Sequence, residues 1–499
     1  MTILLSAGNR VPAPETFDSW CAIGEIGEVP DSKRRLTNIE LLLKAAYDGI
    51  SEMWFKLATD LAKEQTAVFA HAPMCAANSS DMGVMLAWTQ LANTLSKSSQ
   101  RILVLCNDPW MFRHLCENVA TVEILSPAPS FGLKPTRLFV RGVLARSKAA
   151  IRFAIAHIIA CGDRRRCPKG ASTLLVYSHP GTMSNGMDGY FGALMNKIPN
   201  LIRLLHVDRK IGGEEDVPAD GRTFRLDAWG GLAKLFSLPF ARWRPTPNTG
   251  SKANHWLVRR AEALEGSTGQ AAAIRWQQIC QEGFLQSAAP RTIVWPWENH
   301  GWERSLVLAA RKLGVRTIGY QHATIARQEW NYSPKSYPPG ENLAPNDIFC
   351  AGPYFRGELI DIGHDKKKMR IAGFLRGIQS DSLPYDPYAP ILVALPLDRR
   401  IAAQILDAVR PMAQAGRKFV IKAHPKSSPL GVSEELFSFS NYALNEQGPL
   451  AAVIFAATTV GLEALLGGLP VIQFIPSDIV AMDVIPQMMD VVRDRKSVV

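Results

Sequence analysis

The stretch RTIVWPWENHGWERSLVLAARKLGVRTIGYQH (residues 291–322) contains an apolar run, an amphipathic stretch and a second apolar run. The apolar runs, residues 291–298 and 315–322, have the length and composition of buried strands. Between them, residues 303–314 carry apolar residues at helical spacing and end in Gly314, a residue type that commonly follows a helix. A strand, a helix and a second strand in this order predict parallel strands in an α/β domain.

Short apolar runs alternate with amphipathic stretches along much of the chain. This alternation is typical of a parallel sheet covered by helices. The expected fold class is therefore α/β, with two facing Rossmann-like domains and a ligand cleft between them at the carboxyl ends of the strands. Further strands are expected at residues 101–108, 122–127, 172–180 and 347–355, and a second series is expected at residues 369–377, 390–398, 418–426, 451–459 and 470–476.

The boundary between the two domains is expected in a charged stretch. GELIDIGHDKKKMR, residues 357–370, is rich in charged and turn residues, so it is the expected linker. The N-terminal domain then covers residues 1–356, and the C-terminal domain covers residues 371–499. The N-terminal domain carries two basic amphipathic insertions, near residues 135–169 and 224–245.

The composition is that of a globular protein with a basic surface. Of 499 residues, 47% are hydrophobic and 20% charged, and 56 Lys and Arg against 45 Asp and Glu give a formal charge of +11. That charge favours anionic partners, but no RNA-binding signature, zinc-ligand spacing or basic tail indicates nucleic acid. The eight cysteines are scattered without a CxxC pair, as in reduced cytoplasmic proteins. No apolar run is long enough to predict a membrane-spanning helix.

The two basic insertions have the composition of helices that lie in a membrane interface. Both mix Lys and Arg with large apolar side chains. The alternative is that both are ordinary helices whose basic residues point to water. In the first interpretation the protein is cytoplasmic and peripheral on the inner face of the cytoplasmic membrane, with an anionic membrane surface as a partner. The residues expected in the lipid are Phe139, Leu144, Phe153, Ile158 and Trp243, and those expected at the headgroups are Arg141, Arg146, Arg152 and Arg164–Arg166.

A basic cluster follows one of the later strands. In KFVIKAHPKSS, a strand beginning at Phe419 brings Lys422 and His424 to its carboxyl end, where open parallel sheets bind ligands. Pro425 stops the strand there. Lysine and histidine can both donate hydrogen bonds to oxyanions, so this strand end suits a phosphate or diphosphate. The alternative is a surface strand end with incidental basic residues.

A second pattern suited to anions lies in FAATTVGLEALLGGLPVI, residues 455–472. The expected strand ends at Thr458 and Thr459, and a helix begins near Gly461. Threonine hydroxyls and the free N–H groups of a helix start can bind an anion. Glu463, in the first turn, can accept hydrogen bonds from the hydroxyl groups of a ribose or sugar. An ordinary capped helix contains the same residues and is the alternative.

Together these two patterns resemble the donor half of glycosyltransferases of the GT-B fold, which have two facing α/β domains. The sequence is most similar to bacterial surface-carbohydrate enzymes of capsule and lipopolysaccharide synthesis, in the sialyl- and Kdo-transferase-like families. In those families a His-Pro motif and a Ser/Thr pair grip the nucleotide phosphate, and the matches here are His424-Pro425 and Thr458-Thr459. The resemblance implies a nucleotide-sugar donor with no metal ion and no cofactor, because basic groups stabilise the leaving phosphate.

The expected general base lies in WPWENHGWER, residues 295–304. Inverting sugar transfer needs a base within hydrogen-bond reach of the acceptor hydroxyl. Glu298 directly follows a strand, so its carboxylate is expected at the cleft. Glu303 and His322 are the rival candidates, although Glu303 also fits a plain helix-start carboxylate and His322 an ordinary loop histidine. Sialyltransferase-like families have an acidic pair followed by glycine, whereas this chain has Glu298-Asn299-His300-Gly301.

An acceptor site is expected in the polar, glycine-rich stretch of residues 177–200. Asn185, Asp188 and Tyr190 follow a predicted strand there and carry groups that can contact a sugar. A surface loop without a functional role is the alternative.

These features predict a glycosyltransferase that moves a sugar from a nucleotide-activated donor onto a surface polysaccharide or a lipid-linked glycan. The resemblance favours CMP-Kdo or a related CMP-sugar as the donor. The alternatives are a polyol-phosphate transferase of the teichoic-acid type, a nucleotide-sugar epimerase, and a non-catalytic GT-B-like scaffold of polysaccharide assembly.

Overall fold

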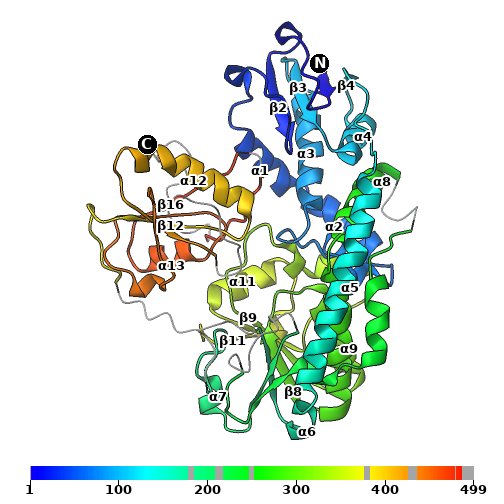
Figure 1. Cartoon of the computed structure of the whole chain (residues 1–499), viewed down its shortest axis with the longest axis vertical. Helices are drawn as coiled ribbons and strands as arrows, with labels where there is room; N and C mark the ends of the chain where they lie inside the picture. Colours follow the sequence, from blue (N-terminus) through cyan, green and yellow to red (C-terminus); the bar gives the residue numbers. More distant parts are fainter. Residues whose placement is uncertain are drawn as a thin grey trace. The chain divides into compact units, whose positions relative to one another are not determined.

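The computed structural model describes residues 2–177, 185–207, 217–246, 252–375, 382–424, 435–477 and 479–485 (Figure 1). The strands in each of its three sheets pair in parallel, and helices lie between them in the sequence, which confirms the predicted α/β fold class. The chain divides into two compact units. Unit 1 comprises residues 1–35, 49–322 and 330–377, and unit 2 comprises residues 36–48, 323–329 and 378–499.

Unit 1 begins with a four-stranded sheet in the order β2-β3-β1-β4. Its strands are β1 (Ile3–Ser6), β2 (Ser19–Ile23), β3 (Ile102–Cys106) and β4 (Val122–Ile124), and its helices are α2 (Ser51–Leu61), α3 (Met82–Leu95) and α4 (Pro109–Asn118). The sequence predicts β3 and β4 but not β1 or β2. Leu4 of β1 and Trp20 of β2 are buried in one cluster with Leu103, so tertiary packing defines two strands too short to predict from their own pattern.

A seven-stranded sheet forms the rest of unit 1, in the order β11-β10-β9-β8-β5-β6-β7. Residues 291–322 form its centre as β8 (Thr292–Pro296), α10 (Gly301–Lys312) and β9 (Arg316–Gln321), so the predicted strand–helix–strand segment is confirmed. The other strands are β5 (Thr173–Val176), β6 (Ile202–Leu205), β7 (Thr223–Arg225), β10 (Asp347–Cys350) and β11 (Met369–Ile371). The accompanying helices are α5 (Lys134–Ala160), α6 (Asp163–Arg166), α7 (Leu194–Lys197), α8 (His255–Glu265), α9 (Gln270–Ala288) and α11 (Pro353–Asp361).

The strand order of this sheet reverses direction at β5. β6 and β7 follow β5 on one side, whereas β8 and the later strands lie on its other side. The topological switch point is therefore between β5 and β8. In open parallel sheets, ligands bind outside the carboxyl ends of the strands at such a point.

The expected linker at residues 357–370 is wrong. Its first residues belong to α11, and its last residues enter β11, which pairs with β10. The segment therefore extends the seven-stranded sheet, and only three lysines, residues 366–368, form an exposed 3-10 turn. The units instead meet along the chain between residues 377 and 378, and two earlier segments group with unit 2.

Unit 2 contains a five-stranded sheet in the order β14-β13-β12-β15-β16. Its elements are β12 (Ile391–Ala394), α12 (Arg399–Gln414), β13 (Phe419–Lys422), β14 (Ser438–Phe439), β15 (Ala452–Phe455), α13 (Val460–Leu466) and β16 (Val471–Gln473), together with most of α1 (Ile39–Gly49). β13 and β14 follow β12 on one side, and β15 and β16 lie on the other. The switch point of this sheet is therefore between β12 and β15.

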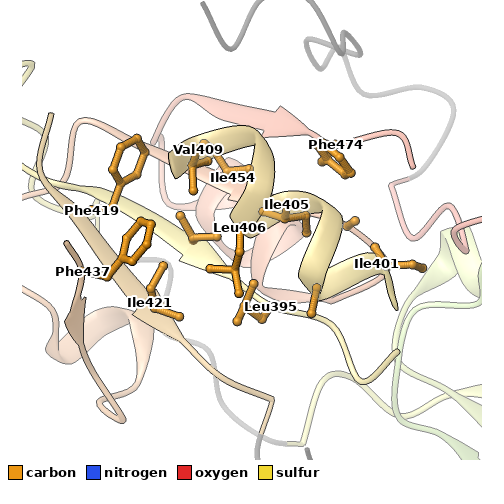
Figure 2. Packing of buried hydrophobic residues seen from close by; sticks show 13 residues of the cluster. Leu395, Ile401, Ile405, Leu406, Val409, Phe419, Ile421, Phe437, Ile454 and Phe474 are labelled. Carbon is orange, nitrogen blue, oxygen red and sulfur yellow. The ribbon is translucent and has the colours of Figure 1, made fainter. Parts of the chain in front are cut away.

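One core cluster of unit 2 lies between α12 and the sheet (Figure 2). Ile401, Ile405 and Val409 recur at four-residue spacing, so they lie on one face of the helix. They are buried in a single cluster with Ile421 of β13 and Ile454 of β15. Burying a side chain of this size contributes about 1.5–3 kcal/mol. The helix therefore stabilises the strands on both sides of β12.

The two basic insertions adopt different structures. Residues 135–169 form most of α5 and all of α6, whereas residues 224–245 form the end of β7 and two 3-10 segments, η6 (Leu226–Trp229) and η7 (Leu232–Phe240). The second insertion is thus not an α-helix, because Gly230, Gly231 and Pro239 oppose helix formation. In the part of the chain that the structure describes, no helix is long and apolar enough to cross a membrane.

Candidate active site

Glu298 lies at the switch point of the seven-stranded sheet. β8 ends at Pro296, and α10 begins at Gly301, so Glu298 occupies the turn at the carboxyl end of β8. The flanking side chains of Trp295 and Trp297 are fully buried and anchor the turn in the core of unit 1. The partly exposed carboxylate of Glu298 is therefore carried by a turn that buried side chains hold in place.

Two histidines contact the carboxylate of Glu298. The Nε2 atom of His300 lies 3.1 Å from Oε2, and the Nε2 atom of His322 lies 3.7 Å from Oε1. The side chain of Glu298 is 38% exposed, whereas that of His322 is only 6% exposed. His300 is thus within hydrogen-bond distance of one oxygen, His322 lies close to the other, and the carboxylate remains partly accessible to solvent. The sequence singled out Glu298 and His322 but not His300, whose position two residues after the glutamate was the available signal.

The turn that brings Glu298 and His300 together depends on Asn299. This buried residue has φ of +60°, in the left-handed region, where Asn is among the better tolerated residues. Its Nδ2 donates to the carbonyl of Asn331 at 2.6 Å, and its Oδ1 accepts from the hydroxyl of Tyr337 at 3.2 Å. The buried guanidinium of Arg304 donates to the carbonyls of both Asn299 and Asn331. These hydrogen bonds connect the turn at Asn299 with the segment that contains Asn331.

The carboxylate of Glu303, the rival candidate for the base, accepts hydrogen bonds from the turn that carries Glu298. Its buried carboxylate accepts hydrogen bonds from the indole of Trp295 at 2.8 Å and from the backbone N–H groups of Glu298, Asn299 and His300 at 3.0–3.3 Å. Burial raises the pKa of Glu303 to about 7, while charge on His300 and the bond from Trp295 act in the opposite direction. Its bonds and its burial therefore favour a role in positioning the turn.

An aromatic and histidine-rich wall lies next to His322. The ring of Tyr190 meets His322 edge to face, with centroids 5.0 Å apart. His206 packs against Tyr177 at 4.4 Å and against Trp302 at 4.8 Å. Tyr177 follows β5 directly, so residues from both strands of the switch point contribute to this part of unit 1. Such rings offer apolar faces and polar edges that suit a sugar.

The residues expected to bind the acceptor have different environments. Asp188 is buried, and its Oδ1 accepts from the backbone N–H groups of Tyr190 and Phe191, both at 2.7 Å. This geometry holds a turn and so assigns the carboxylate a structural role. Tyr190 lies against His322, whereas Asn185 is exposed. Tyr190 is therefore the one of the three that contacts the Glu298 site.

In unit 2, Lys422 and His424 lie at the carboxyl end of β13. Lys422 is the last residue of the strand, and its ammonium group donates to the carbonyls of Asn441 and Tyr442. Burial lowers the pKa of Lys422, and the charges of Glu463 and Glu446 oppose this shift. His424 is half-buried just beyond the strand, and Pro425 lies outside the described residues.

The Thr458-Thr459 pair lies at the carboxyl end of β15, on the other side of β12. Both residues are half-buried, and the carbonyl of Thr459 accepts from the N–H of Glu463. Gly461 has a packing role, because a Cβ atom there would lie 2.4 Å from the ring of Phe455. The candidate donor residues thus occupy the carboxyl edge of the sheet around its switch point.

No group of three or more His, Cys, Asp or Glu side chains suited to a metal ion occurs among the described residues.

The sequence matches no protein-family model and no curated protein. Solved structures with similar folds include a UDP-N-acetylglucosamine 2-epimerase from Rickettsia bellii (11% identity, covering 61% of this chain and 79% of that chain, TM-score 0.36). They also include a lipopolysaccharide outer core galactosyltransferase (9% identity, 60% and 80% covered, TM-score 0.32) and the glycosyltransferase SnogD from Streptomyces nogalater (12% identity, 61% and 81% covered, TM-score 0.33). Similarity at this level carries no argument about function, which rests on the geometry above.

The role of Glu303 can be tested by its effect on stability. Glu303→Gln replaces one acceptor oxygen by an NH2 group that faces buried N–H donors. We expect this change to lower the free energy of unfolding by about 1–3 kcal/mol, measured by urea denaturation with circular dichroism. The matched change Glu298→Gln, on a partly exposed side chain, should leave stability nearly unchanged. Equal stability of both variants would refute the positioning role of Glu303.

Proposed function

We propose that the protein is a glycosyltransferase that moves a sugar from a nucleotide-activated donor onto a hydroxyl group of a surface polysaccharide or lipid-linked glycan. The observation that carries the proposal is the partly exposed carboxylate of Glu298, which contacts His300 and His322 at a topological switch point. A carboxylate oriented in this way and open to solvent suits a general base for an incoming hydroxyl.

In the proposed reaction, Glu298 accepts the proton of the acceptor hydroxyl. The oxygen of that hydroxyl attacks the anomeric carbon of the donor sugar. The bond from that carbon to the phosphate oxygen breaks, and the nucleotide leaves with the bonding electrons. His300 and His322 keep the carboxylate in position, and the proton resides on Glu298 until it passes to solvent. Attack from the face opposite the leaving group inverts the configuration of the sugar.

The donor is proposed to bind unit 2 at the carboxyl edge of the five-stranded sheet. Lys422 and His424 supply positive charge for the phosphates. Thr458 and Thr459 supply hydroxyl groups, and Glu463 accepts from the sugar or ribose. These groups stabilise the leaving phosphate without requiring a metal ion. The resemblance to sialyl- and Kdo-transferase-like families favours a CMP-linked sugar such as CMP-Kdo.

The proposed base is tested by Glu298→Gln, which keeps the shape of the side chain but removes the proton acceptor. Turnover, measured as nucleotide release, should fall by about 10²–10⁴-fold, while calorimetry should show unchanged nucleotide affinity. Tyr190→Phe is a milder change on the same wall and should retain most activity. Full turnover by a folded Glu298→Gln variant would exclude this carboxylate as the base.

A location at the inner face of the cytoplasmic membrane is proposed from the outer side of α5. Val140, Leu144, Ile151, Ile155 and Ile158 follow one another at three-, four- and seven-residue intervals, so they form one stripe. Each is 46–65% exposed, and we call them the exposed stripe. Neighbouring η7 also exposes large apolar side chains, Leu232, Phe236 and Phe240.

Charge complements this apolar surface. α5 contains no Asp or Glu, and the exposed residues Arg137, Arg141, Lys148 and Arg152 lie along it. Such a combination suits insertion of apolar side chains among anionic headgroups. It would also confine the enzyme to the surface that carries a lipid-linked acceptor.

Three of the residues expected at the membrane must be corrected, because they are buried. Phe153 stacks on Trp276, with ring centroids 5.9 Å apart, and Trp243 is 2% exposed. Arg146 turns inward and donates to the carbonyls of Pro239 and Gly266. These side chains attach α5 to the body of unit 1, whereas the residues of the exposed stripe face away from it.

Flotation with vesicles tests the proposed location. The protein should float with phosphatidylglycerol vesicles at low salt, and binding should weaken at high salt because screening removes the headgroup attraction. The double variant Leu144→Ser/Ile151→Ser should lose most binding, whereas Ile124→Ser, an exposed residue on β4, should not. Protein that stays unbound at both salt concentrations would reject the membrane surface as a partner.

A further inference from the structure

A separate cavity lies in unit 1 near the N-terminal end of α5. Its volume is about 380 Å³, and its lining comes from segments far apart in the sequence. The side chains that matter below are Trp110 of α4, Phe131, Phe139 of α5, Arg242, and Trp256 and Arg259 of α8. None of them belongs to the two sites described above.

Aromatic rings form one wall of this cavity. Phe131 stacks on Trp256 with centroids 6.1 Å apart and an interplanar angle of 26°, and Trp110 meets Phe131 edge to face at 5.1 Å. The guanidinium of Arg113 lies 4.3 Å from the centre of the Phe131 ring, and the indole of Trp256 donates to Glu117 at 2.7 Å. The rings are thus held in place by their own neighbours, so the wall is preorganised for a ligand.

The lining of the cavity also carries positive charge. Arg259 is neutralised by Glu262 at 2.7 Å, but Arg242 has no carboxylate partner among the described residues. Its guanidinium lies over the ring of Phe139, 5.2 Å from the centroid. The pKa of Arg146 is lowered chiefly by burial and further by Arg242 and Arg244, so three guanidinium groups lie near one another here.

Phe139 connects the cavity with the membrane-facing side of α5. Its side chain lines the cavity and is also 49% exposed, one residue before Val140 of the exposed stripe. A ligand with an anionic group at Arg242 and an apolar part would therefore find apolar surface leading out along α5. A nucleotide sugar or a free anion has no apolar chain to bury against that surface.

We infer that this cavity binds the phosphate-bearing headgroup of an anionic membrane lipid, with the phosphate on Arg242 and the glycerol and upper acyl chain against Phe139 and the aromatic wall. Guanidinium groups bind phosphate with charge-assisted hydrogen bonds. The inference concerns lipid recognition alone, so it does not depend on which sugar, if any, the protein transfers.

Binding of soluble short-chain lipids to the full chain tests this inference. Dihexanoyl phosphatidic acid, titrated below its micelle concentration, should quench or shift tryptophan fluorescence saturably, because Trp110 and Trp256 line the cavity. Arg242→Gln should weaken this binding at least about tenfold. Arg244→Gln is the matched control, because Arg244 is two residues from Arg242 and its exposed side chain is not part of the cavity lining. This variant loses the same charge and should change the affinity less than about twofold.

Phe139→Ala provides a second variant that leaves every charge in place, and it should weaken lipid binding without affecting the response to salt. Dihexanoyl phosphatidylcholine and inorganic phosphate are the comparison ligands, and both should bind much more weakly than phosphatidic acid. Equal losses from Arg242→Gln and Arg244→Gln would mean a diffuse charge effect and would overturn the site. Inorganic phosphate binding as tightly as the lipid, or no saturable lipid binding, would also overturn it. Lipid binding is measured without a nucleotide sugar, so failure of the lipid site is distinguished from failure of the proposed transferase.

Discussion

Four N–H groups converge on the buried carboxylate of Glu303, and the turn between β8 and α10 depends on them. Three of these donors belong to the backbone of the turn itself, so the carboxylate replaces the partners that the first residues of a helix lack. Asn299 can then adopt its left-handed conformation, and the side chains of Glu298 and His300 emerge on the same side. A structural glutamate thus positions the proposed base five residues before it.

The two units use the same topological device to place their candidate residues. In each parallel sheet the chain adds strands first on one side and then on the other, which leaves a switch point beside the earliest strand. Glu298 follows β8 at the switch point of the larger sheet, and Thr458 and Thr459 follow β15 at that of the smaller one. Side-chain packing holds the strands in both units. In unit 2 the packing comes from α12, and in unit 1 it comes from the buried Trp295 and Trp297 at β8.

The sequence allowed prediction of elements whose pattern is local, such as the strand–helix–strand segment at residues 291–322. It failed where long-range pairing decides the outcome: residues 369–377 were expected to open the second series of strands, yet β11 joins the seven-stranded sheet at β10. The choice of Glu298 over Glu303 also followed from its position after a strand, whereas the contact with His300 requires the backbone geometry of Asn299. Arg146 shows the converse limit, because Leu144 and Lys148 on either side of it are exposed, whereas its own guanidinium donates to carbonyl groups of two distant segments.

Nucleotide release by the purified full chain tests the proposed transfer most directly. The donors are a panel of CMP-, UDP- and GDP-sugars and CDP-glycerol, and the acceptor is a lipid-linked glycan. The account predicts release from one class of nucleotide sugar, coupled to appearance of that sugar on the acceptor. Release from CDP-glycerol would identify a polyol-phosphate transferase instead, and isomerisation of the donor sugar without acceptor would identify an epimerase. Absence of release from every donor would contradict catalysis and leave a scaffold as the function.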